Sequence, residues 1–151
     1  LFQDQGGFYE SHAMSEDRLW FSHTADGAYY VDDCFTAALD GSGLENLTNS
    51  PSTWDEHCHP SPQGTLAFNS SRSQDWDAGD GDLATSLRLE VWVQQEGGQP
   101  EQLTRYNDEA GRRPRVVTSD FAWGPNGELL AYRVEIRGRD WSQALDRIEL
   151  E

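Results

Sequence analysis

Short stretches in which apolar and polar residues alternate recur along this chain of 151 residues. Residues 89–93 (LEVWV) are the clearest example, and turns that contain glycine or proline separate such stretches. Apolar side chains at every second position are typical of a β-strand with one buried face. Because few segments carry an apolar pattern long enough for a helix, the sequence predicts an all-β fold.

A block that reads strand, tight turn, strand occurs twice. Residues 57–68 (HCHPSPQGTLAF) match residues 120–132 (DFAWGPNGELLAY), and the proline and glycine of the two turns align. Proline presets φ early in such a turn, and glycine supplies the positive φ later in it. A weaker third copy, residues 13–21 (AMSEDRLWF), lacks both of these residues. The copies indicate an internal repeat.

A second shared block follows the first one. Residues 34–48 (CFTAALDGSGLENLT) align with residues 91–104 (VWVQQEGGQPEQLT), each with an apolar strand, a glycine turn and a short strand that ends in Leu-Thr. Residues 147–150 (RIEL) would be the third strand of the last copy. We therefore expect one domain over residues 1–151. It would contain three tandem repeats of four antiparallel strands, at about residues 8–48, 53–104 and 116–151.

The order of these blocks resembles the repeat of TolB-like, WD40-like β-propellers. The resemblance rests on the turn at residues 61–64 (SPQG) and on the strands at residues 66–68 (LAF) and 102–104 (QLT). It implies that each repeat is one propeller blade. Propellers of this family usually close with about six blades, so three blades would leave faces and strand edges open. We expect missing residues, a protein partner or self-assembly to cover them.

The charge balance argues against two classes of partner. The chain carries 27 acidic and 11 basic residues, for a formal net charge of -16, so nucleic-acid phosphates and anionic membranes repel it. No apolar stretch approaches the roughly 18 residues that a membrane span needs. We expect no nucleic-acid partner and no membrane span, and the family resemblance implies a periplasmic or extracellular location.

The densest acidic cluster comprises Asp75, Asp77, Asp80 and Asp82. Glycines between them let the chain curl, and carboxylates are ligands that Ca²⁺ prefers. The spacing departs from that of an EF-hand loop, because Asp80 comes one residue late and Ser86 stands where the loop needs glutamate. Two interpretations stay open: a calcium site formed by the four aspartates, or a solvated acidic hairpin loop.

Histidine and cysteine residues raise two further alternatives. His12 and His57 precede turns on the innermost strands of their repeats, where propeller strands line a central channel, so the two side chains are placed where they can converge. Three interpretations stay open: structural histidines, a site for Zn²⁺ or another transition metal together with His59 and Cys58, or haem ligation. Cys34 and Cys58 would form a disulfide between the third strand of one blade and the first strand of the next, or stay two buried thiols.

The tryptophans divide into two groups. Those near loops, beside acidic or polar residues, are Trp54, Trp76 and Trp141. Because tryptophan is enriched at the energetic centres of protein interfaces, each is a candidate anchor for a partner, with packing over a blade edge as the alternative. Those at strand positions are expected in the core: Trp20, Trp92 and Trp123.

No sequence motif for catalysis is present: there is no G-x-S-x-G elbow, no P-loop and no dinucleotide fingerprint. We therefore expect no enzyme, and no cofactor other than the Ca²⁺ considered above. The resemblance implies a non-catalytic, protein-binding or scaffolding propeller segment of a larger extracytoplasmic protein or complex. Two alternatives stay open. One is the gating propeller of a serine-peptidase-like enzyme whose catalytic domain lies elsewhere, and the other is a cation-stabilised structural module.

Overall fold

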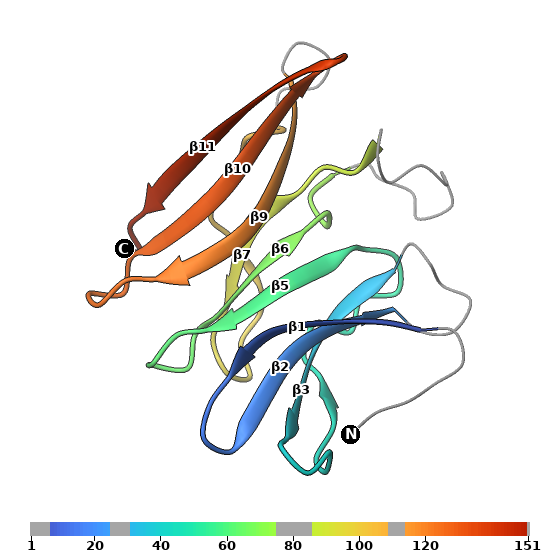
Figure 1. Ribbon diagram of the computed structural model, residues 1–151, viewed down its shortest axis with the longest axis vertical. Helices are drawn as coiled ribbons and strands as arrows, with labels where there is room; N and C mark the ends of the chain where they lie inside the picture. The colour runs from blue at the N-terminus through green and yellow to red at the C-terminus, as the bar shows by residue number, and fades with distance from the viewer. Residues whose placement is uncertain (1–6, 25–30, 75–85, 109–113, 151) are drawn as a thin grey trace.

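The computed structural model describes residues 7–24, 31–74, 86–108 and 114–150. Within these residues the chain forms eleven β-strands, which assemble into three antiparallel sheets (Figure 1). The expectation of an all-β, antiparallel fold is confirmed. The described residues contain no helix that is long and apolar enough to cross a membrane.

Each sheet is a meander in which consecutive strands are neighbours. The first sheet contains β1 (Phe8–Met14), β2 (Arg18–Thr24), β3 (Asp32–Ala38) and β4 (Glu45–Asn46). The second sheet contains β5 (Asp55–Pro60), β6 (Leu66–Ser70), β7 (Glu90–Gln94) and β8 (Glu101–Gln102). The third sheet contains β9 (Arg115–Trp123), β10 (Leu129–Arg137) and β11 (Asp140–Ile148).

The third sheet differs from the expected four-stranded repeat. Its third strand, β11, begins at Asp140, well before residue 147, where the sequence pattern places it. A tight turn at Gly138, which has φ 62°, joins β10 to β11, and each of these strands runs for 9 residues. The third repeat therefore lengthens its hairpin, and the described residues provide no fourth strand for it.

The turn between the first two strands is the same in the second and third sheets. Gly64 N–H donates to the carbonyl of Ser61 at 3.0 Å, and Gly127 N–H donates to the carbonyl of Gly124 at 3.2 Å. Both donor glycines have positive φ, 89° and 86°, a region that glycine enters without steric penalty. In the first sheet the turn that begins at Ser15 is one residue shorter, which explains why its sequence lacks the proline and the glycine.

A second equivalence explains the shared Leu-Thr ending. Thr48 Oγ1 donates to Asp33 Oδ1 at 3.0 Å, and Thr104 Oγ1 donates to Glu90 Oε2 at 2.6 Å. Each hydroxyl also accepts the backbone N–H of the residue after its carboxylate, at 3.0 and 2.8 Å. The same clasp, formed by a threonine hydroxyl, a carboxylate and a backbone N–H, therefore holds the outer end of the first sheet and of the second.

The second sheet lies between the other two (Figure 1). A buried cluster joins it to the first sheet, with members Cys34, Cys58, Leu66 and Phe68 and the half-buried Trp20 against them. Another cluster joins it to the third sheet, with members Ala67, Val91, Val93, Phe121, Leu129 and Ala131. Two inter-sheet layers, rather than one central core, therefore hold the described part of the chain together.

Candidate functional site

The first strand of every sheet carries a β-bulge at a comparable place. The bulges fall between Ser11 and Ala13 in β1, between Glu56 and His59 in β5, and between Thr118 and Phe121 in β9. A bulge adds one residue to its strand and redirects side chains. Because β5 contacts both β1 and β9, the three bulges bring polar side chains toward one region.

Three histidines meet in this region. The His12 ring on β1 lies 5.2 Å from the ring of His57 and 6.0 Å from that of His59, both on β5. His57 has φ 54°, a left-handed conformation that is uncommon for residues other than glycine. The predicted convergence of His12 and His57 is confirmed.

Hydrogen bonds tie His57 to the third sheet. Asn69, fully buried on β6, has its Nδ2 at 3.2 Å from His57 Nδ1 and donates to the carbonyl of Ser119 at 3.0 Å. Thr118 Oγ1 donates to the side-chain oxygen of Asn69, Oδ1, at 2.6 Å. Asp120 Oδ1 lies 3.7 Å from His57 Nε2. The histidine cluster is therefore part of a polar network that links β5 and β6 to β9.

The environment separates the pKa values of the three imidazoles. Burial opposes protonation of His57, but nearby carboxylates, led by Glu56, outweigh this effect and raise its pKa. Burial lowers the pKa of His12 to about 3, and repulsion from His57 and His59 adds to the shift. Burial likewise lowers the pKa of His59, with repulsion from His57 as the second cause. The cluster therefore takes its first proton at His57.

Asp32 is a second unusual group close to the same inter-sheet layer. It is fully buried at the start of β3, and neither carboxyl oxygen has a hydrogen-bond partner of normal geometry among the described residues. Burial raises its pKa to about 8; the Ser22 hydroxyl opposes the shift, and the charges of Glu56, Asp33 and Glu10 add to it. This carboxyl is therefore largely protonated at neutral pH.

The candidate metal sites stand differently. The four aspartates of the proposed calcium site, Asp75, Asp77, Asp80 and Asp82, lie outside the described residues. Within the described part of the chain, no group of three or more His, Cys, Asp or Glu side chains is placed to hold a metal ion. The histidine cluster is thus a group of hydrogen-bonded side chains whose rings are tilted relative to one another.

The two cysteines form a disulfide. Cys34 on β3 and Cys58 in the β5 bulge are bonded, with their Cα atoms 5.8 Å apart, and both are fully buried. Of the two alternatives left open by the sequence, the structure contains the disulfide. It connects the first sheet to the second inside their shared apolar layer.

The three loop tryptophans differ in their exposure to solvent. Trp54 is only 9% exposed and packs with Leu87 and Leu89, so of its two interpretations the structure favours packing within the chain over an exposed anchor. Trp141 at the start of β11 is 64% exposed. Trp76 lies outside the described residues.

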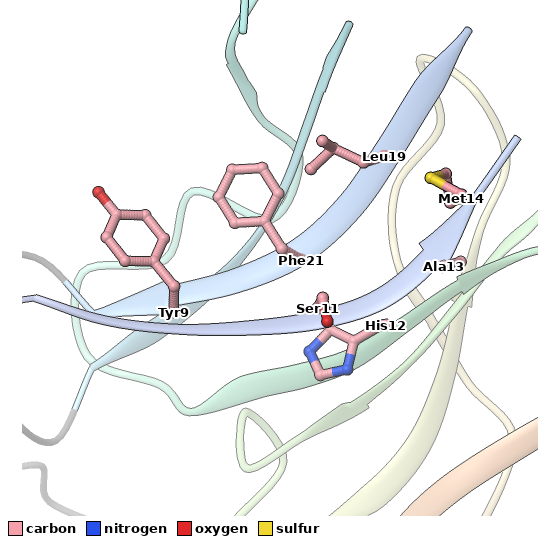
Figure 2. Close-up of a pocket in the computed structure, with 7 residues that line it drawn as sticks. All are labelled: Tyr9, Ser11, His12, Ala13, Met14, Leu19 and Phe21. Carbon is pink, nitrogen blue, oxygen red and sulfur yellow. The ribbon is translucent and has the colours of Figure 1, made fainter. Parts of the chain in front are cut away.

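An apolar hollow of about 620 Å³ lies on the first sheet, lined by Tyr9, Ser11, His12, Ala13, Met14, Leu19 and Phe21. Figure 2 shows Leu19, Phe21 and Met14 on one side of the β1–β2 ribbon, while His12 lies on the side of the neighbouring strand of the second sheet. Met14 is 76% exposed. The sequence analysis missed this surface because an exposed apolar side chain and a buried one give the same alternating pattern.

Comparison with known proteins adds no relative. No protein-family model, no curated protein and no solved structure matches this chain. The resemblance to TolB-like propeller repeats therefore stays a prediction, and the functional argument rests on this chain's own residues.

Proposed function

We propose that this chain is a non-catalytic, protein-binding or scaffolding module, in which the three sheets are successive blades of a β-propeller-like array. The equivalent turns, clasps and bulges of the sheets support the repeat. The disulfide supports a location outside the cytoplasm, because disulfides persist mainly in oxidising compartments.

One observation carries the binding function: both ends of the array carry apolar side chains in contact with solvent. At one end is the hollow of the first sheet, with Met14 at its rim. At the other end, Trp141 and Leu145 on the third sheet are 64% and 66% exposed. Contiguous exposed apolar surface of this kind marks interaction sites on soluble proteins, and tryptophan is a frequent anchor in them.

The polar network has a supporting role in this proposal. His57, Asn69 and Ser119 connect the second sheet to the third, and Trp123 Nε1 donates to the carbonyl of His59 at 2.9 Å. These contacts fix the angle between adjacent sheets, and with it the direction in which each end surface points.

The single methionine of the chain provides the test, because Met14 lies on one of the end surfaces. Peroxide oxidation of Met14, followed by mass spectrometry, is measured in the native particle and in the separated, folded chain. We expect oxidation at least about fivefold slower in the particle, because a bound surface shields the thioether. Equal rates in the two samples would contradict the proposal.

A further inference from the structure

The three sheets pack on one another by a constant rule. In each sheet a leucine directly follows the residue whose carbonyl closes the turn before the second strand: Leu19, Leu66 and Leu129. Leu66 and Leu129 pack against the sheet that precedes theirs, whereas the residue after the leucine, Trp20 or Ala67, packs against the sheet that follows. Successive strand residues point to opposite faces, so each sheet has a leucine face and an opposite face. In both contacts between sheets, the leucine face of one sheet packs against the opposite face of the sheet before it.

The two ends of the array present the two halves of this same contact. Leu19 lines the hollow of the first sheet, on the face that packs against a preceding sheet in the other two sheets. Leu130, which follows Leu129, is 40% exposed on the third sheet, on the face that packs against a following sheet in the other two. The end surfaces therefore continue the interfaces that already exist within the chain.

The side of the third sheet that carries Leu130 is built for burial. Residues directly opposite one another in β10 and β11 share a face. This outer face carries four such pairs: Leu130 with Arg147, Tyr132 with Leu145, Val134 with Gln143, and Ile136 with Trp141. Apart from Arg147, the charged residues of the paired positions lie on the other face: Arg133, Glu135, Arg137, Asp140 and Asp146.

The charge distribution also favours contact between the two end surfaces. The chain has 27 acidic residues among 151, yet neither the lining of the hollow nor the four pairs of the outer face includes an Asp or a Glu. Among the described residues that form the two surfaces, the carboxylates that would repel a second chain of the same charge are thus absent. Bringing the two surfaces together would bury Trp141, Leu145 and Met14 without burying an unpaired carboxylate.

We propose that a second copy of this chain covers both end surfaces: the outer face of the third sheet of each copy packs into the hollow of the first sheet of the other. This rests on the proposed function and names its partner. A two-fold axis forms the contact twice, so each copy uses both of its surfaces and the assembly closes instead of growing into a fibre. The resulting ring of six sheets lies within the range of about 4–8 blades that propellers adopt.

Sedimentation analysis of the chain and three glutamate variants tests the proposal. Leu145→Glu alters the outer face and Met14→Glu alters the rim of the hollow, at positions 66% and 76% exposed, so neither change disturbs the folded chain. Leu44→Glu, at a position 53% exposed outside both surfaces, is the matched control. We expect a dimer for the chain itself and for the control, and a dimer weakened at least about tenfold for each of the other variants.

Mixing the two weakened variants gives the decisive result. In a mixed dimer, one contact carries both new carboxylates, but the other pairs an unaltered outer face with an unaltered hollow. We therefore expect the mixture to associate more tightly than either variant alone. A monomer at all concentrations, oligomers larger than a dimer, or no recovery on mixing would overturn the second copy as partner. If Met14 is nevertheless shielded in the native particle, the proposed binding function stands with a different partner.

Discussion

At the scale of single residues, the most unusual group is Asp32, which is fully buried and has no compensating cation among the described residues. Asp55 is equally buried, but Arg72 Nη2 lies 2.5 Å from its Oδ2. In the described part of the chain no arginine or lysine plays this role for Asp32, and burial raises its pKa to about 8. A buried carboxyl in this situation is tolerated by staying protonated.

Asp32 therefore gives the stability a specific pH dependence. Its pKa is higher in the folded chain than in the unfolded one, so its contribution is fully present below about pH 4 and is lost as pH rises toward 8. Each pH unit in this window is worth at most about 1.4 kcal/mol. We expect Asp32→Asn to raise the free energy of unfolding by about 2 kcal/mol or more at pH 7.5, as measured by urea denaturation.

The matched control for this substitution is Asp140→Asn, which removes an exposed carboxylate. The gain from Asp32→Asn should vanish when both proteins are compared below pH 4. A gain that is independent of pH, or no gain at pH 7.5, would show that Asp32 ionises normally in the folded chain.

At the scale of elements, the disulfide and the clasps hold strands that are far apart in the sequence. Cys34 and Cys58 are separated by 24 positions, and closing a loop of this size stabilises a fold by about 3 kcal/mol in the chain-entropy model. We expect the double variant Cys34→Ala, Cys58→Ala to lose about this amount. Thiol titration of the denatured, unreduced protein should find no free thiol, and two free thiols would contradict the bond.

The equivalence of the repeats makes a separate prediction about the two clasps. Thr48→Val and Thr104→Val each remove one hydroxyl that both donates to a carboxylate and accepts a backbone N–H. We expect each variant to lower the free energy of unfolding by about 1–3 kcal/mol. The serine variants, which keep the hydroxyl, should lose much less. A loss confined to one of the two threonines would indicate that the sheets are not equivalent.

These elements also show what the sequence predicts and where it fails. The turns at Gly64 and Gly127 are predictable because positive φ requires a particular residue type. The length of β11 is not, since Trp141 and Leu145 on its outer face and Ile148 on its inner face leave no clean alternation. The bulges and the burial of Asp32 are equally hidden, because both depend on the neighbouring sheet rather than on local sequence.

At the scale of the whole molecule, the arrangement is an open stack that has the same kind of contact at every step. Inside the stack the apolar faces of adjacent sheets bury each other. The hollow of the first sheet and the outer face of the third instead carry exposed apolar side chains. The net charge of -16 keeps such a chain soluble. Because the described residues of the two end surfaces include no Asp or Glu, these are the surfaces through which we propose that the molecule binds.

The identity of the surface that covers the outer face is the most direct test of this account. A photoreactive benzophenone side chain placed at Trp141, in the native particle, is irradiated and its crosslinked peptide is sequenced. We predict a crosslink to β1 or β2 of another chain, in the segment that contains Met14 and Leu19. Crosslinks confined to the loops of a partner, or no crosslink from a folded particle, would contradict the claim that the stack continues across its two ends.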